Sequence, residues 1–300
     1  MANEGGSLIS IDGKHFGKAA QLLIEKISLA IGGAFMPTQM KRIARAEAET
    51  ALIAAQAQIE INDLQRRAAL RWVAEETRKQ VNIEAITEKA IEQLDDGADP
   101  SNIEDDWIAN FFEKSKIVSD EEMQKIWAQV LAQEANHPGK FSKRAVNIIA
   151  ELSKRDAEAF TSLCRFILPQ LGEALIFNEN DHIYNNNGVS FGTITELESI
   201  GLVNYAGLGS FSRNAITRKI LATYFNSPII FELDDGVTSM PIGKVIFTTA
   251  GRELSHIIKT NPVPEFLNYV LNYYQQQAGI SAKPPKVQIT VPAGAAPGAA

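Results

Sequence analysis

ARAEAETALIAAQA, residues 44–57, is half alanine and lies within residues 37–94, a stretch with no glycine and no proline after Pro37. Alanine is the strongest helix former, and most other positions carry Leu, Arg, Gln, Glu or Lys, which also favour helices. Pro37 suits the first turn of a helix, where its missing N–H costs nothing. The stretch therefore predicts one long helix, or two nearly continuous ones.

An apolar stripe follows one face of this predicted helix. Its members recur mostly every three or four residues, as on a helix face, and the alanines among them let a second helix approach closely. The spacing is not a clean heptad, so an antiparallel hairpin or bundle is favoured over a long two-stranded coiled coil. We expect self-association through this stripe, which comprises Ile53, Ala57, Ile61, Leu64, Ala68 and Trp72.

The N-terminal region has a flexible start, residues 1–13, followed by an amphipathic helix that opens the 14–98 region. Its apolar face includes Phe16, Leu23, Ile27 and Ile31. Three interpretations are open: an internal core helix, a helix docked on a partner, or a helix lying on a membrane surface. The internal core is favoured, because the polar face is short of the Lys and Arg that interfacial helices carry.

Capping signals divide residues 99–177 into a compact helical module. Residues 119–122 form a capping box, and Ser142 and Asp156 precede two further helices. The acids Glu104, Asp105 and Asp106 fall in a first helical turn, where the helix dipole favours negative charge. Capping is therefore favoured over a metal site at these acids.

Residues 178–277 change character and predict a small α+β domain. We expect a helix at 194–200, a strand at 202–205, a hairpin of strands 229–233 and 243–248, and two closing helices. This order is typical of winged-helix domains. Nucleic-acid contact, as an alternative, would use Arg213, Arg218, Lys219 and Lys244. Nearby acids make protein contact the favoured role of this domain.

Composition and charge set the class of protein. The chain has 300 residues, 45% of them hydrophobic, a net charge of −7 and one cysteine. These values predict a two-domain globular protein and argue against non-specific coating of nucleic acid.

The single Cys164 excludes an intrachain disulfide and suits the cytoplasm. No signal peptide or transmembrane helix is recognisable, so we expect cytoplasmic localisation, with membrane-surface association as the alternative. Residues 278–300, rich in Pro, Ala and Gly, predict disorder.

Motifs of catalysis are missing from the sequence. It contains no glycine-rich phosphate loop, no Ser-His-Asp set, no paired zinc ligands and no HExxH. We therefore predict no catalytic, cofactor-binding or metal-binding residues and expect a protein that is not an enzyme.

Several segments together resemble a bacterial family, DUF2806. They are DWIANFF (106–112), VSDEEMQ (118–124), IWAQVLA (126–132), PGKFS (138–142) and KRDAEAF (154–160), with RIARAE (42–47) and QVNIE (80–84) upstream. This resemblance implies no established activity, and no site residue is transferred from it. A more distant similarity, to the abortive-infection alpha family of phage defence, implies a role in phage defence or stress response.

The sequence as a whole predicts a mainly α fold. A long Ala-rich hairpin or rod and a compact helical bundle precede the winged-helix-like α+β domain. The function we expect is interaction or assembly, with self-association into a homo-oligomer through the long helix. The alternatives are a winged-helix nucleic-acid-binding regulator and a peripheral membrane protein.

Overall fold

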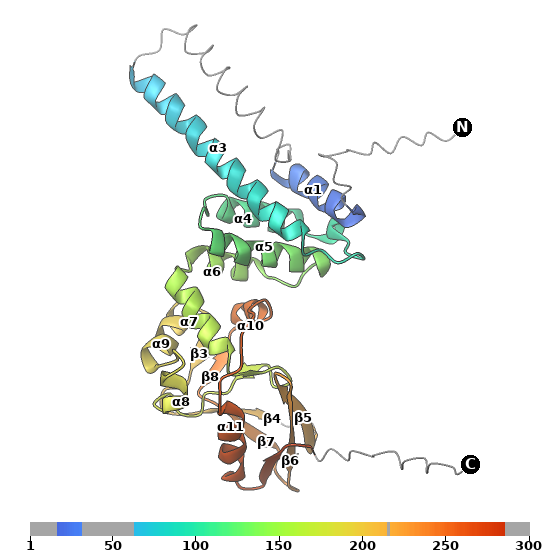
Figure 1. Cartoon of the computed structure of the whole chain (residues 1–300), viewed down its shortest axis with the longest axis vertical. Helices are drawn as coiled ribbons and strands as arrows, with labels where there is room; N and C mark the ends of the chain where they lie inside the picture. The colour runs from blue at the N-terminus through green and yellow to red at the C-terminus, as the bar shows by residue number, and fades with distance from the viewer. Residues whose placement is uncertain (1–16, 32–62, 215–216, 286–300) are drawn as a thin grey trace, which may run out of the picture. The chain divides into compact units, whose positions relative to one another are not determined.

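The structure is a computed structural model that describes residues 17–31, 63–214 and 217–285 (Figure 1). They fall into two compact units. The first comprises Met1–Arg155 and Thr249–Ile258, and the second comprises Asp156–Thr248 and Lys259–Ala300. Residues 1–13, Phe16, Ile53, Ala57 and Ile61, which carry some of the expectations above, lie outside the described residues.

The described part of the first unit is helical. Its elements are α1 (Lys18–Ile31), α3 (Asp63–Ile91), the 3₁₀ helix η1 (Pro100–Asn102), α4 (Asp105–Ser115), α5 (Glu121–Asn136), α6 (Lys143–Glu151) and α10 (Thr249–Ser255). The second half of α3 packs against α5, α1 packs against α4, and α10 packs against α6. Helix α10 is therefore supplied by a segment about 100 residues downstream of α6.

Side-chain caps set where several of these helices begin. The Asp99 carboxylate accepts the Ser101 N–H, and the Ser142 hydroxyl accepts the Ala145 N–H. Asp120, rather than Ser119, caps α5 by accepting the Met123 N–H at 3.0 Å. Such a cap satisfies a backbone donor that the first helical turn leaves unpaired.

Aromatic side chains form the centre of the first unit. Trp107 stacks on Phe111, which meets Trp127 edge to face. The Trp107 indole N–H donates to the Phe141 carbonyl at 2.8 Å, so its buried polar atom is satisfied. This packing ties α4 to α5 and to the loop before α6.

The second unit contains helices and small sheets. Its helices are α7 (Lys154–Cys164, which starts at the unit boundary), α8 (His182–Asn185), α9 (Phe191–Ser199) and α11 (Phe266–Gln275). Its strands are β1 (Ile167–Leu168), β2 (Glu173–Ala174), β3 (Val203–Tyr205), β4 (Phe211–Asn214), β5 (Lys219–Tyr224), β6 (Ser227–Leu233), β7 (Ser239–Gly243), β8 (Val245–Phe247) and β9 (Ile280–Lys283). All the pairings between them are antiparallel, in the sheets β1–β2, β3–β8, β4–β7 and β5–β6–β9.

The expected hairpin is wrong in its pairing. Strand β6 pairs with β5 and β9, whereas β7 and β8 pair with β4 and β3. The β5–β6 turn is Phe225-Asn226, in which Phe225 has φ of 51° without being glycine. Because this turn lacks the glycine that usually marks a hairpin, the sequence pattern did not indicate it. Strand β9 also lies in the tail predicted to be disordered, and its Ile280 and Ala282 are buried.

The fold class predicted from the sequence is also wrong. The chain is a mixed α/β protein with several small antiparallel sheets, not a mainly α protein built on a long helical rod. Strand β4 carries Ser, Arg and Asn at exposed positions, so its sequence resembles a polar loop. Within the described residues, α3 begins only at Asp63, and its second half belongs to the helical bundle.

Candidate functional site

Helix α3 presents an apolar face to solvent along its first half. Leu64, Ala68 and Trp72 are spaced four residues apart and therefore lie on one side of the helix. Residues 63–72 are all exposed, with relative exposures of 67% for Leu64 and 64% for Trp72. A tryptophan this open is unusual, and tryptophan is the residue type most often found at the energetic centre of protein interfaces. We call Leu64, Ala68 and Trp72 the α3 stripe.

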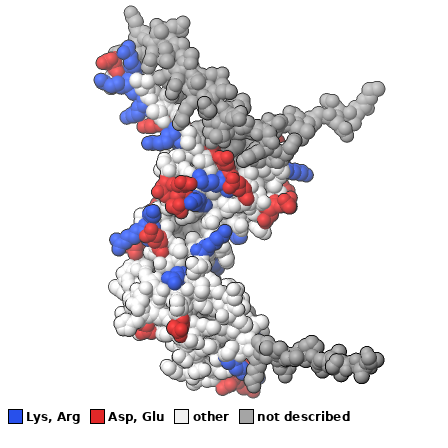
Figure 2. All heavy atoms as spheres, viewed as in Figure 1, with Lys and Arg blue, Asp and Glu red and all other residues white. Residues whose placement is uncertain are grey.

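Charges of both signs surround the α3 stripe. Arg66 lies 3.9 Å from Asp63, and Arg71 lies 3.8 Å from Glu75. Figure 2 shows this mixture of Lys and Arg with Asp and Glu along the described part of α3. Exposed pairs of this kind contribute little to stability, so the balance of charge matters chiefly for solubility and for the choice of partner.

The second half of α3 is anchored by a buried polar network. The Asn82 amide donates to the Lys116 carbonyl at 2.9 Å, and the Gln124 amide donates to the Asn82 side-chain oxygen at 3.3 Å. Lys89 Nζ donates to the Gln124 side-chain oxygen at 3.0 Å. This network joins the second half of α3 to α5, so the exposed first half of α3 extends from a firmly packed segment.

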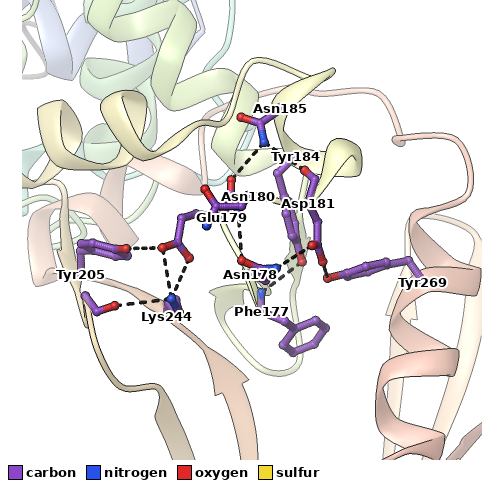
Figure 3. Close-up of polar contacts among 11 residues, drawn as sticks. Phe177, Asn178, Glu179, Asn180, Asp181, Tyr184, Asn185, Tyr205, Lys244 and Tyr269 are labelled. Carbon is purple, nitrogen blue, oxygen red and sulfur yellow. Dashed lines mark hydrogen bonds and ion pairs between the residues drawn. The ribbon is translucent and has the colours of Figure 1, made fainter.

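A second candidate is a polar cluster in the second unit, around Glu179 (Figure 3). The buried Glu179 carboxylate accepts the Tyr205 hydroxyl at 2.6 Å and lies 2.9 Å from Lys244 Nζ. Burial acts to raise the pKa of Glu179, but the hydrogen bonds from Tyr205 and Lys244 outweigh it and hold that pKa below its usual value. Burial, together with the Glu179 carboxylate, raises the pKa of Tyr205 to about 12.

A neighbouring set of hydrogen bonds extends this cluster to α11. The Tyr269 hydroxyl donates to Asp181 Oδ2 at 2.6 Å, and the Asn178 amide donates to Asp181 Oδ1 at 2.7 Å. The Tyr184 hydroxyl donates to the Leu175 carbonyl and accepts the Phe177 N–H. Figure 3 shows these side chains converging on the loop between β2 and α8.

This cluster acts as a structural clamp, because its hydrogen bonds and ion pair join the loop after β2 to neighbouring strands. At neutral pH, Glu179 is ionised and Tyr205 is protonated, since their pKa values are displaced in those directions. The ionised carboxylate is held by donors from β3 and from the residue between β7 and β8, so the cluster fastens the loop to these strands. These groups are already engaged with one another, which makes them poor candidates for a nucleophile or a general base.

The sequence reasoning missed this cluster. Residues 178–188 read as an asparagine-rich loop facing solvent, yet Glu179 is only 7% exposed. Its partners Tyr205 and Lys244 lie 26 and 65 residues further along the chain. The signal in the sequence was an acid, Glu179, in a loop between the apolar residues Phe177 and Tyr184. Such a pattern does not indicate which residues bind the acid.

The residues predicted for nucleic-acid contact are engaged within the protein. Lys244 pairs with Glu179, Lys219 with Glu232, and Arg218 with Asp235. Arg213 donates from Nη1 to the carbonyls of Leu171 and Gln170. Three of these four cations are therefore neutralised by carboxylates, which weakens any basic surface they could form.

The apolar face of α1 is mostly inside the first unit. Leu23 and Ile27 are fully buried, Ile31 is partly buried, and α1 packs on α4 and η1. The interpretation as an internal core helix is thus confirmed for Leu23 and Ile27. No helix among the described residues has the length and hydropathy needed to span a bilayer.

Metal ligands and reactive thiols were sought in the part of the chain that the structure describes. There, no three His, Cys, Asp or Glu side chains are placed to hold a metal ion together. Cys164 is buried, and its burial raises the pKa of the thiol well above the usual value. A thiol in that state is a poor nucleophile at neutral pH.

Comparison with known families agrees with the sequence prediction. A family described as "Protein of unknown function (DUF2806)" matches residues 66–271. The chain belongs to the DUF2806 family. The DUF2806 match runs from the exposed half of α3 to α11 and therefore includes Trp72, the Glu179 cluster and Tyr269. No curated protein and no solved structure matches the chain, and the similarity to abortive-infection alpha proteins is not confirmed.

Proposed function

We propose that this DUF2806 protein is an assembly protein whose chains pair through the α3 stripe. The observation that carries the proposal is the exposure of Leu64 and Trp72 on a helix whose other half is firmly anchored. Burying two large apolar side chains of each copy would remove several hundred Å² of apolar surface from water in all, since an aromatic side chain alone covers about 150–250 Å². Such a patch is large enough to contribute usefully to association.

The sequence of α3 favours a second copy of the chain as the occupant. In an antiparallel pair centred on Ala68, the small alanine would lie at the crossing point, where close approach is needed. Leu64 of each helix would then face Trp72 of the other, because both are four residues, or about 6 Å, from the centre. A two-fold arrangement of this kind makes the same stripe complementary to itself.

One pair of charges beside the stripe, Arg71 and Asp63, fits the same arrangement. In the antiparallel pair, the end of one helix that carries Arg71 would lie near the end of the other that carries Asp63. These two residues have opposite charge, and both are largely exposed in the chain described here. Charge complementarity of this kind orients the helices more than it holds them together.

A role in phage defence or another stress response is part of this proposal only through the distant family resemblance. The nucleic-acid alternative is less favoured, because Arg218, Lys219 and Lys244 are paired with acids. The membrane alternative is less favoured because Leu23 and Ile27 are already buried.

The proposal is tested by measuring solution mass by light scattering after gel filtration, at two salt concentrations. We expect a mass near twice 32.8 kDa for the wild-type protein, and a monomer for Trp72→Glu. Leu208→Glu is the matched control, because Leu208 is fully exposed on a loop of the other unit; it should remain a dimer. A wild-type monomer at the highest soluble concentration, or a dimer that persists in Trp72→Glu, would contradict the proposal.

A further inference from the structure

The second unit contains a cleft of about 170 Å³ between the paired strands β4 and β7 and strand β5. Its lining has an apolar side and a polar side: Leu171, Ile220 and Met240 on the first, and Gln170, Arg213, Asn214 and Thr217 on the second. Leu171 and Met240 are buried, whereas Arg213 is exposed. The cleft thus combines an apolar floor with one cationic group.

Arg213 is held in place by one edge of its guanidinium. Its Nη1 donates to the Leu171 carbonyl at 2.5 Å and to the Gln170 carbonyl at 3.3 Å. A guanidinium has five N–H donors, and both of these bonds use Nη1, so Nε and Nη2 are not engaged by this anchoring. Among the described residues no carboxylate forms an ion pair with Arg213, in contrast to Arg218, Lys219 and Lys244.

The wall that anchors Arg213 is itself fixed. The Gln170 amide donates to the Thr223 hydroxyl at 2.9 Å, and the Thr223 N–H donates to the Gln170 side-chain oxygen at 2.8 Å. These reciprocal bonds tie the turn after β1 to strand β5. On the other side, Arg213 lies directly opposite Met240 in the β4–β7 ladder. The position of the guanidinium is therefore set by three strands before any ligand arrives.

We infer that this cleft binds a small carboxylate with an apolar tail. The carboxylate pairs with Arg213, whose planar donors match two carboxylate oxygens, and the tail lies against Leu171, Ile220 and Met240. The size limits the ligand, because a cavity of about 150 Å³ accommodates one benzene molecule. A ligand of roughly six to nine non-hydrogen atoms fits on that scale.

A single arginine above an apolar floor favours a carboxylate over a phosphate. A phosphate dianion needs several charged or backbone donors, as helix N-termini and glycine-rich loops provide. Here the lining offers one cationic group, because Gln170 is already bonded to Thr223 and the Thr217 hydroxyl donates to the Lys219 carbonyl. The carboxylate can belong to a free aliphatic acid or to the C-terminus of a short peptide, and the experiment separates these two sources.

The test is calorimetric titration of the full-length protein with hexanoate, hexanamide, inorganic phosphate and N-acetylalanine. We expect saturable binding of hexanoate, no measurable binding of neutral hexanamide, and phosphate binding at least tenfold weaker than hexanoate. Tighter binding of N-acetylalanine than of hexanoate assigns the site to a peptide C-terminus, and the reverse assigns it to a free acid. Absence of saturable binding by both carboxylates, or equal binding of phosphate, would overturn the inference.

Two variants connect the binding to the cleft. Arg213→Gln should weaken hexanoate binding at least tenfold, whereas the control Arg218→Gln, whose partner is Asp235, should leave it unchanged. Ile220→Trp fills the cleft without removing charge and should also abolish binding. Thermal unfolding confirms that each variant is folded, and Ile220→Trp keeps the test decisive if Arg213→Gln is unstable. Equal affinity in the wild type and both cleft variants would show that the ligand binds elsewhere.

Discussion

The α3 stripe and the Glu179 cluster both reverse the usual distribution of side chains, in opposite directions. In the stripe, the apolar side chains of Leu64 and Trp72 are exposed to solvent, whereas in the cluster the charged side chain of Glu179 is buried. The difference lies in their partners. Glu179 has Tyr205 and Lys244 within its own unit, whereas the stripe is exposed throughout residues 63–72. A buried charge that is paired within its own unit stabilises the fold, whereas large apolar side chains that remain exposed indicate an interface.

The largest expected effect is that of Lys244→Met on stability. This change leaves the Glu179 carboxylate buried without its cation, which costs about 3–5 kcal/mol for a fully buried pair. Because the Lys244 side chain is 22% exposed, we expect a value toward the lower end of that range. Urea unfolding at neutral pH measures it. A loss below about 0.5 kcal/mol, the size of an ordinary surface substitution, would show that the cluster is not a clamp.

Glu179→Gln should make stability less dependent on pH. The folded pKa of Glu179 is below its unfolded value of about 4.5, so its stabilising contribution is present above that pH and is lost as pH falls through the folded pKa. We expect the variant to be less stable at pH 7 by about 1.5–3 kcal/mol, the range for a hydrogen-bonded charge. The difference from wild type should shrink below about pH 4, and urea unfolding across pH 3–7 would show it. An unchanged difference at every pH would contradict this assignment.

Tyr205→Phe removes one of the two donors to Glu179 and should cost about 1 kcal/mol, the typical value for one hydrogen bond. Since Lys244 remains, the carboxylate stays paired, and its pKa should rise toward the usual value. Unfolding measurements on the single and double variants with Lys244→Met give the coupling between the two donors. Strict additivity would mean that the two donors act independently.

The smallest effect on the stability of the isolated chain is expected for Trp72→Ala. An exposed side chain contributes within about 0.5 kcal/mol, so unfolding at low protein concentration should be almost unchanged. At high concentration the wild type should gain stability from association while the variant does not. Melting temperatures over a concentration series measure this. A large loss at low concentration would place Trp72 in the fold rather than at an interface.

Local signals in the sequence located several of the helices, some with the start misplaced by one or two residues, but did not predict the pairing of the sheets. Ser142 caps a helix where the pattern predicted, because a cap and the N–H it accepts lie within three residues, whereas Asp156 lies inside the first turn of α7. Strand β4 depends on a partner elsewhere in the chain, β7, and its polar exposed positions resemble a loop. The Glu179 cluster was missed for the same reason, because its donors come from distant strands. The α3 stripe could be predicted in part, since Leu64, Ala68 and Trp72 repeat at helical spacing, but their exposure could not.

Helix α10 has a consequence for how this protein is made. The Ser142 N–H and hydroxyl both donate to Glu253 of α10, across a separation of 111 residues. A chain emerging from the ribosome therefore cannot complete its helical unit until Asp156–Thr248, the first segment of the second unit, has been synthesised. The closure of so long a loop is slow compared with local helix formation. Fragments that end before α10 would expose the α6 surface that it covers, so a truncation between the two units is an unsafe way to obtain the helical unit alone.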